Sequence, residues 1–374
     1  MSKTALDSLV AAGLALALLV VLGVDRLLPT STSTARLEQV AAEPSPLRVR
    51  KLRLAVSLTS KPKHDWDKMP GLLDHLGQGY QYTQVPVRDL YNPNTFDGFD
   101  VLFFTCSPEG NDQAVADNLR QFVARGGTLY ASDWRFLAVA KAFPDMVNKG
   151  LIGEGADQKL EADVVDAGLQ DALGTKHVSL RFDLPEWKTA AFGGERVKVL
   201  MKARYLVQPP EGSEPSQWAE TPLLVKFGFD KGTVIFTSFH NEAQNSEVEK
   251  KLLKYLVFSA VTAQIENEAN LTMLKGGFSP QKSNLFSASG QSAVSNVYKS
   301  KAPKVRFILG FQEQGARLKL MVIRPDGVQR EMEGTSTIVL EDTCPTVGDW
   351  RYTVTALSVP FPDFPFTLTV GESP

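Results

Sequence analysis

The hydrophobic pattern is clearest between residues 100 and 134, where two apolar runs flank an amphipathic segment. The run Val101–Thr105 is typical of a strand that is buried on both faces. In the segment after it, the apolar residues fall on one face of a helix: Val115, Leu119, Phe122 and Val123. Gly126 and Gly127 are expected to end that helix, and Thr128–Ser132 reads as a second buried strand. This strand–helix–strand unit predicts an open, parallel α/β sheet.

The same alternation extends over residues 51–265 and predicts a doubly wound, mostly parallel sheet. Leu52–Leu58 is its expected first strand. The helix expected after it is capped by Asp65 or Asp67 and has one apolar face, made of Met69, Leu72, Leu73 and Leu76. Further on, residues 222–242 hold two apolar strands around an Asp-Lys-Gly turn, which predicts a β-hairpin.

The hydrophobic period changes in the C-terminal part of the chain. Residues 266–300 are polar, with paired glycines and many Ser and Asn residues, and are predicted to be a linker between domains. From residue 301 to 374 apolar and polar residues alternate, as they do at Val305, Phe307, Leu309 and Phe311. Because no helical pattern interrupts this alternation, residues 301–374 are predicted to form an all-β sandwich.

The N-terminal segment is predicted to attach the protein to a membrane. Residues 1–29 contain the uncharged run Ser8–Val24, which is just long enough for a transmembrane helix. A cleaved signal peptide is the alternative. Residues 30–50 are rich in Ser, Thr, Ala and Pro and are predicted to be a flexible tether. The folded domains are expected outside the cytoplasm, but the basic residues after the span leave the cytoplasmic side open.

Composition narrows the classes of function. A hydrophobic content of 43% allows a full core, and a net charge of −2 gives no sign of a polyanion partner. No basic stripe laced with aromatic residues points to nucleic acid. Cys106 and Cys344 fall in different predicted domains, so neither a disulfide framework nor a thiolate cluster is expected. No two histidines stand at metal-ligand spacing, and neither a metal site nor a cofactor is predicted.

The segment Phe239-His240-Asn241-Glu242 resembles the class I glutamine amidotransferase superfamily, which carries F-H-P-E at the end of a late strand. In that family the histidine and glutamate are the base and the orienting carboxylate of a Cys-His-Glu triad, so the resemblance implies these roles for His240 and Glu242. Alternate residues of an extended segment project to the same side, which allows such a carboxylate to orient the imidazole. The resemblance covers roughly residues 52–263, is closest to trehalose-utilisation-like members, and implies a flavodoxin-like sheet.

The chain departs from the family at the nucleophile. The matching turn, residues 131–134, has no cysteine and lacks the flanking glycines that relieve a strained elbow. Ser132 or Asp133 takes the nucleophile position, depending on a one-residue choice of alignment. Cys106 ends the preceding strand, in the loop where the family places its oxyanion-hole glycines. The candidate ligand-binding residues are therefore Cys106, Asp133, Trp134 and His240.

The C-terminal part resembles pre-peptidase C-terminal and immunoglobulin-like sandwich modules of exported bacterial proteins. The residues that carry this resemblance are the turn Ile323–Gly327, the segment Val347–Val354 and the final F-T-L-T-V strand. Modules of these families bind partners or space domains and carry no chemistry. The resemblance therefore implies an exported protein with a protein partner or a small ligand.

The pattern as a whole favours a membrane-anchored, non-catalytic binding or scaffolding protein with a degenerate amidotransferase-like domain. The rival hypothesis is a serine hydrolase that uses Ser132, His240 and Glu242 on an ester or amide. It requires the Ser132 hydroxyl to lie within hydrogen-bond reach of His240. A further alternative, a sugar-binding domain, rests on the trehalose-utilisation resemblance alone.

Overall fold

The computed structural model describes residues 52–61, 66–312 and 315–374. The predicted transmembrane segment 1–29 and the predicted tether 30–50 lie outside these residues, as does Asp65. Among the described residues, no helix combines the length and the apolar character that crossing a membrane requires.

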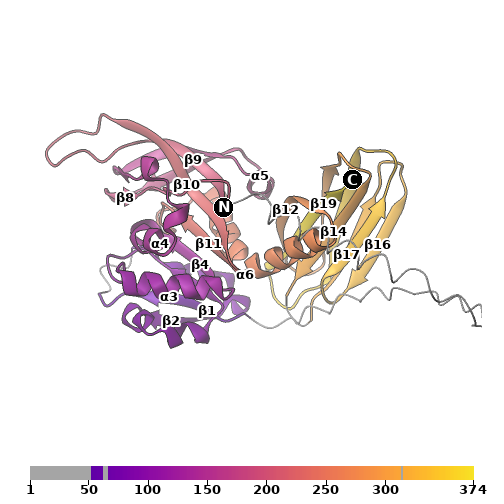
Figure 1. The fold of residues 1–374 in the computed structure, drawn as a ribbon, viewed down its shortest axis with the longest axis horizontal. Helices are drawn as coiled ribbons and strands as arrows, with labels where there is room; N and C mark the ends of the chain where they lie inside the picture. Colours follow the sequence, from indigo (N-terminus) through magenta and orange to yellow (C-terminus); the bar gives the residue numbers. More distant parts are fainter. Residues whose placement is uncertain (1–51, 62–65, 313–314) are drawn as a thin grey trace, which may run out of the picture. The chain divides into compact units, whose positions relative to one another are not determined.

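A nine-stranded mixed sheet organises the first part of the chain, in the order β2-β1-β3-β4-β11-β10-β9-β6-β7 (Figure 1). Strands β2, β1, β3, β4 and β11 pair in parallel, and the strands from β10 to β7 pair antiparallel. The parallel part confirms the α/β prediction. The sheet is mixed rather than mostly parallel, because hairpins such as the one that joins β10 to β11 make neighbouring strands antiparallel. The strands are β1 Leu54–Leu58, β2 Tyr82–Pro86, β3 Val101–Phe104, β4 Thr128–Ser132, β6 Gln158–Val164, β7 His177–Phe182, β9 Val197–Leu206, β10 Trp218–Phe229 and β11 Gly232–Thr237.

Helices cover both faces of this sheet. Leu54 and Val56 of β1 point into a core with α2, α5 and α6, while Ala55 between them points into a second core with α3 and α4. Helices α3 and α4 lie side by side on that second face (Figure 1). The helices are α2 Met69–Leu76, α3 Gln113–Ala124, α4 Phe136–Ala142, α5 Ala167–Leu173 and α6 Glu247–Lys275. Short elements complete this part: η2 Gln78–Tyr80, η3 Val87–Tyr91, η4 Pro93–Gly98, η5 Asp133–Arg135, η6 Pro144–Met146, η7 Lys149–Leu151, and the two-stranded sheet of β5 Glu154–Gly155 and β8 Trp187–Lys188.

The starts of the helices show where side chains serve as caps and where they do not. The carboxylate of Asp112 accepts hydrogen bonds from the backbone of the first turn of α3, and Ser246 with Glu249 forms a capping box at the start of α6. Helix α2 begins after Lys68 without a side-chain cap. The prediction that Asp67 caps this helix is therefore wrong, and its carboxylate contacts Ser132 instead.

Two four-stranded antiparallel sheets form the C-terminal β-sandwich, with the orders β12-β19-β14-β17 and β13-β18-β15-β16. The strands are β12 Ser279–Ala288, β13 Ser292–Lys299, β14 Lys304–Phe311, β15 Arg317–Ile323, β16 Gln329–Gly334, β17 Ile338–Thr343, β18 Asp349–Ser358 and β19 Phe364–Ser373. Alternate residues of these strands fill one core, including Val305, Phe307 and Leu309 from β14 and Trp350, Tyr352 and Val354 from β18.

The predicted linker 266–300 differs from the structure. Helix α6 continues to Lys275, and β12 and β13 follow it after a short turn. These residues are polar because most side chains of β12 and β13 are exposed or half-buried. The sandwich therefore begins at β12, ahead of the predicted boundary at residue 301, and polarity alone did not distinguish an exposed strand from a linker.

Candidate functional site

The candidate site lies where three neighbouring parallel strands end. Cys106 follows β3, Asp133 follows β4 and His240 follows β11, and these strands pair in the order β3-β4-β11. The carboxyl ends of adjacent parallel strands meet at one edge of a sheet, which brings the three side chains together. All three are buried, with exposed fractions of 0% for Cys106, 2% for Asp133 and 6% for His240.

Asp133 is the centre of this cluster. Its Oδ2 atom lies 2.9 Å from Nε2 of His240 and accepts a hydrogen bond from the Cys106 thiol, with an Sγ–Oδ2 distance of 3.4 Å. Its Oδ1 atom accepts a hydrogen bond of 2.5 Å from the backbone N–H of Lys188. Both carboxylate oxygens are therefore engaged by protein groups.

The backbone at Asp133 has a left-handed conformation. Its φ angle is +47°, and it is the first residue of the turn η5 that follows β4. Aspartate tolerates this region better than most residues, because its short polar side chain forms local hydrogen bonds. Asp133 is therefore the residue of this turn with the left-handed backbone, whereas Ser132 before it is extended. The turn forms without the flanking glycines that the sequence argument required.

Ser132 belongs to a different set of contacts. It is the last residue of β4 and is fully buried. Its hydroxyl donates a hydrogen bond of 2.6 Å to Oδ2 of Asp67 and accepts one of 2.9 Å from the backbone N–H of Cys106. Among the described residues, His240 makes its side-chain hydrogen bond to Asp133, and none joins it to Ser132. The geometry that the serine hydrolase hypothesis requires is therefore missing.

Asp67 is a part of the cluster that the sequence analysis missed. Besides the Ser132 hydroxyl, it accepts a hydrogen bond of 3.0 Å from the backbone N–H of Asn241, and it is fully buried. It thereby links the loop after β1 to the ends of β4 and β11. The available signal was its position: it follows a strand of the parallel sheet, where ligand-facing residues gather.

Glu242 and Trp134 do not join the cluster. The Glu242 carboxylate forms an ion pair of 2.9 Å with Nζ of Lys68 and is about one-third exposed. No described contact joins it to His240, so the triad role implied for Glu242 is not seen. The Trp134 ring is half-buried and stacks beneath Nζ of Lys188, which lies 4.6 Å from the ring centroid.

The electrostatics of the cluster favour a neutral thiol beside an ion pair. Burial raises the pKa of the Cys106 thiol well above its ordinary value, and the nearby Asp133 carboxylate raises it further. Burial by itself would lower the pKa of His240, but the hydrogen bond and the charge of Asp133 outweigh it, so this pKa is raised. Cys106 therefore lacks the thiolate character of an activated nucleophile.

Arg135 fixes the loop after β3. It is fully buried, its Nε donates to the Thr105 carbonyl at 2.7 Å, and its Nη1 donates to the Glu109 carbonyl. The guanidinium carbon lies 3.7 Å from the ring centroid of Phe104. Burial lowers the pKa of Arg135 to about 9, which still leaves it charged at neutral pH. The loop after β3 is thus held in place by a buried cation.

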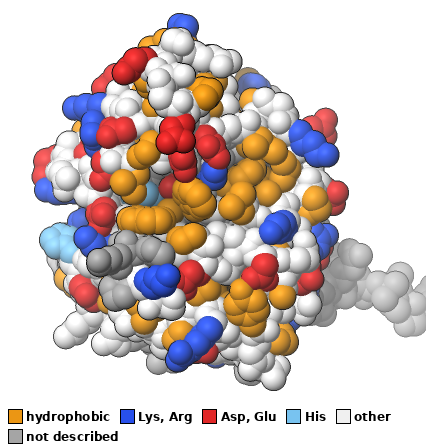
Figure 2. All heavy atoms as spheres, turned by 90° about the vertical axis from the view of Figure 1, so that its left-hand side faces the viewer, with side chains coloured by type: hydrophobic (Ala, Val, Ile, Leu, Met, Phe, Trp, Pro, Cys, Tyr) orange, Lys and Arg blue, Asp and Glu red, His pale blue; other side chains and the backbone are white. Residues whose placement is uncertain are grey.

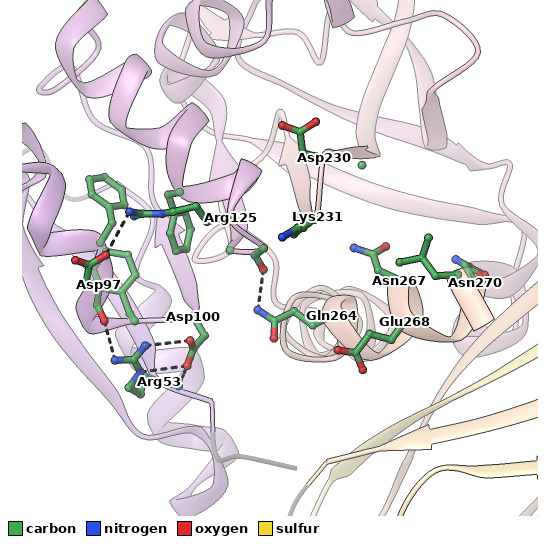
Figure 3. Close-up of a pocket in the computed structure, with 18 residues that line it drawn as sticks. Arg53, Asp97, Asp100, Arg125, Asp230, Lys231, Gln264, Asn267, Glu268 and Asn270 are labelled. Carbon is green, nitrogen blue, oxygen red and sulfur yellow. Dashed lines mark hydrogen bonds and ion pairs between the residues drawn. The ribbon is translucent and has the colours of Figure 1, made fainter. Parts of the chain in front are cut away.

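A separate cavity of about 750 Å³ lies away from this cluster, at the end of the sheet where β1 and β11 begin (Figure 3). Arg53 forms an ion pair of 3.1 Å with Asp100 on one wall, and Gln264 of α6 donates a hydrogen bond of 2.7 Å to the Gly126 carbonyl on the other. Lys231 lies on the side of Gln264, away from the Arg53–Asp100 pair (Figure 3). None of the predicted site residues lines this cavity.

Figure 2 shows one face of the molecule, on which hydrophobic side chains form a central patch with acidic and basic side chains around it. Exposed apolar patches rimmed by polar groups are typical of surfaces that contact partners.

Comparisons with known proteins found similarity only among solved structures. No family model matches the chain, and no curated protein matches it. Similar solved structures include a ThuA-like protein from Bacteroides uniformis, at 12% identity and a TM-score of 0.43, covering 57% of this chain and 93% of that one. The glutaminase domain of Trypanosoma brucei CTPS is similar at 11% identity and a TM-score of 0.36, covering 57% and 94%. A cytoplasmic protein from Salmonella typhimurium is similar at 10% identity and a TM-score of 0.33, covering 55% and 98%. Likenesses this distant carry no argument about activity.

Proposed function

We propose that this chain is a non-catalytic binding protein whose α/β domain has an elbow-like turn at the sheet edge but no working nucleophile. The observation that carries the proposal is the state of Asp133. It has the left-handed backbone of the turn, and its two carboxylate oxygens are engaged by His240, Cys106 and the backbone of Lys188. A residue bound in this way is part of the scaffold rather than a reacting group.

Neither candidate nucleophile of the turn, Asp133 or Ser132, is placed to react. A carboxylate can act as a nucleophile, but both oxygens of Asp133 accept hydrogen bonds and its side chain is only 2% exposed, so it is not presented to an organic substrate. The Ser132 hydroxyl donates its hydrogen bond to Asp67, so His240 is not placed to act as the base for this serine. The serine hydrolase alternative therefore lacks the serine–histidine contact on which it depends. No described residue adds support to the sugar-binding alternative, which still rests on the resemblance alone.

The binding role fits the remaining features of the chain. The sandwich resembles modules that contact partners, and an apolar patch lies on the face shown in Figure 2. A small ligand would have room in the cavity of about 750 Å³ rather than at the closed cluster. The proposal retains the membrane anchor from Ser8–Val24 and an extracytoplasmic location, which rest on the sequence.

The test is a turnover screen of the full-length chain against p-nitrophenyl esters and glutamine. Wild type is compared with Ser132→Ala and His240→Ala. We expect no turnover above the uncatalysed rate in any of the three. Turnover in the wild type that both substitutions abolish would overturn the proposal and establish the serine hydrolase.

A further inference from the structure

The cluster of Cys106, Asp133 and His240 has the chemistry of a transition-metal site. A thiol sulfur, a carboxylate oxygen and an imidazole nitrogen lie within 4.8 Å of one another and are buried. Sulfur, nitrogen and oxygen donors of these types are the ligands that zinc and similar divalent ions take in proteins. We propose that these residues bind one zinc-like divalent transition-metal ion. The inference goes beyond the proposed binding function and does not depend on it.

Two of the three distances between donor atoms lie close to those of a tetrahedral ion, and the third, between Sγ of Cys106 and Nε2 of His240, is at most 4.8 Å. Ligand bonds of about 2.3 Å to sulfur and about 2.0–2.1 Å to nitrogen and oxygen place the donor atoms roughly 3.3–3.6 Å apart in a tetrahedron. The Sγ–Oδ2 distance of 3.4 Å between Cys106 and Asp133 already falls in this range. The Nε2–Oδ2 distance of 2.9 Å between His240 and Asp133 needs to widen by only a few tenths of an ångström.

The charges balance when the ion binds. The ion carries two positive charges, the Cys106 thiol releases its proton to solvent to become a thiolate, and Asp133 is an anion. His240 coordinates through neutral Nε2, and any proton shared by the His240–Asp133 pair leaves as well. The buried complex is then neutral, which avoids the cost of an uncompensated charge in a low-dielectric interior.

The surrounding hydrogen bonds hold the proposed ligands in place. The backbone of Lys188 fixes Oδ1 of Asp133, so Oδ2 stays directed at Cys106 and His240. The backbone of Cys106 is fixed by Ser132, whose hydroxyl is held in turn by Asp67. Supporting contacts of this kind orient the ligands of metal sites. The described residues supply three of the four ligands that a tetrahedral ion takes.

The site could not be found from sequence spacing. Each proposed ligand comes from a different strand end, and the sheet order β3-β4-β11 brings together residues that are far apart in the chain. Metal motifs that are visible in sequence place two ligands within one short segment. The expectation that no metal binds rested on that local criterion alone.

Cobalt is the probe for the test, because a thiolate bound to Co²⁺ gives a charge-transfer band in the near ultraviolet. Full-length chain is stripped with a chelator and titrated with Co²⁺. A second stripped sample is incubated with Zn²⁺, and its bound Zn²⁺ is measured by elemental analysis after dialysis. We expect the band and one equivalent of Zn²⁺ in the wild type.

The chain contains only two cysteines, so Cys344→Ala leaves Cys106 as the only possible thiolate ligand. Cys344 is buried and free like Cys106, and its substitution should leave the band and the zinc content unchanged.

Substitution of the proposed ligands should remove the ion. Cys106→Ser should abolish the band, and both Cys106→Ser and His240→Gln should weaken Zn²⁺ binding by more than the roughly 10- to 100-fold that loss of a supporting residue costs. Circular dichroism confirms that each variant is folded.

A folded wild type without a cobalt band would overturn the inference, as would loss of the band in Cys344→Ala. Wild-type zinc content in a folded Cys106→Ser chain would do the same. If Cys106→Ser does not fold, the band in Cys344→Ala alone decides.

Discussion

Asp133 combines two features that seldom occur together in one residue. Its backbone is in the left-handed region with φ of +47°, and its side chain is 2% exposed and bound on both oxygens. A non-glycine residue in this region costs on the order of 1 kcal/mol or more and persists only where its surroundings compensate. Here the contacts with His240, Cys106 and Lys188 supply that compensation.

Asp133→Ala is therefore expected to destabilise the fold by about 3 kcal/mol or more, because it leaves His240 buried without its partner. The matched control is Asp163→Ala. Asp163 also lies 2.9 Å from a histidine nitrogen, on His177, but both of these side chains are more than half exposed. That control should cost at most about 1 kcal/mol. Urea denaturation measures both, and equal losses in the two variants would contradict the account of Asp133.

At the residue scale, Cys106, Asp133 and His240 were candidates because of the resemblance to the amidotransferase superfamily, and the structure brings their side chains together. Sequence reasoning failed for Glu242, which lies beyond the strand and pairs with Lys68. It also failed for Asp67, because an aspartate before a helix satisfies the capping pattern whether or not its carboxylate turns elsewhere. Local patterns give the position of a side chain along an element, but not its partner across the fold.

At the scale of elements, the β10–β11 hairpin is packed closely against α3. Gly232 opens β11, and a Cβ atom there would lie 2.2 Å from the Val123 carbonyl oxygen and 2.3 Å from that of Gly127. These are backbone atoms, which cannot move aside as a flexible side chain could. The glycine is therefore required by close approach rather than by an unusual backbone angle.

Gly232→Ala should lower stability by about 1–3 kcal/mol, the usual cost of overpacking a rigid interior. Gly228→Ala provides the control within the same hairpin, because Gly228 is exposed and its nearest contact would be 3.9 Å away. We expect that control to change stability by no more than about 0.5 kcal/mol. Thermal melting distinguishes the two, and a Gly232→Ala variant as stable as wild type would be inconsistent with this packing.

Helix α6 is tied to β10 by an ion pair that predicts a pH dependence. Nζ of Lys226 lies 2.5 Å from Oε2 of Glu266. Burial by itself would raise the pKa of Glu266, but the charge and hydrogen bond of Lys226 outweigh it, so this pKa lies below its ordinary value of 4.5. A carboxylate with a lowered folded-state pKa stabilises the fold above the unfolded-state pKa, and that stability is lost as the pH falls through the folded-state value.

Glu266→Gln should accordingly lower the free energy of unfolding by about 2 kcal/mol at pH 7. The difference from wild type should shrink as the pH falls below 4.5. Urea denaturation between neutral and acid pH measures this difference. Glu247→Gln, on the exposed start of the same helix, is the control and should change stability far less than Glu266→Gln, because solvent screens its ion pair with Lys250. A constant difference for Glu266→Gln across the pH range would refute the linkage.

Sequence reasoning predicted most elements of the α/β part, because their buried faces have clear periods of two or 3.6 residues. It failed for the end of α6, residues 266–275, and for β12 and β13, which it read as a linker. Only Ala269 and Met273 of that part of α6 are buried, in a small cluster with Phe278 and Ile308 of the sandwich. A few scattered apolar positions do not give a period, although they suffice to hold an element in place.

At the scale of the whole molecule, the α/β part and the sandwich have separate hydrophobic cores, and helix α6 contacts both. The N-terminal region is predicted from sequence alone, because residues 1–51 lie outside the described part of the chain. The proposed membrane attachment and the proposed absence of catalysis are thus independent claims that need separate measurements.

The attachment is tested by cell fractionation. The full-length chain should sediment with membranes and resist carbonate extraction, because Ser8–Val24 is uncharged and apolar over the length of a short span. Deletion of residues 1–30 should give a soluble, folded product. An intact chain found wholly in the soluble fraction would rule the anchor out.

The absence of a working nucleophile is tested most directly by covalent labelling, which needs no knowledge of a substrate. The full-length chain is treated with a fluorophosphonate, which reacts with activated serines, and its intact mass is measured beside that of Ser132→Ala. Because the Ser132 hydroxyl is buried and donates to Asp67, the account predicts an unmodified mass for both chains. A single adduct on the wild type that Ser132→Ala eliminates would contradict the account.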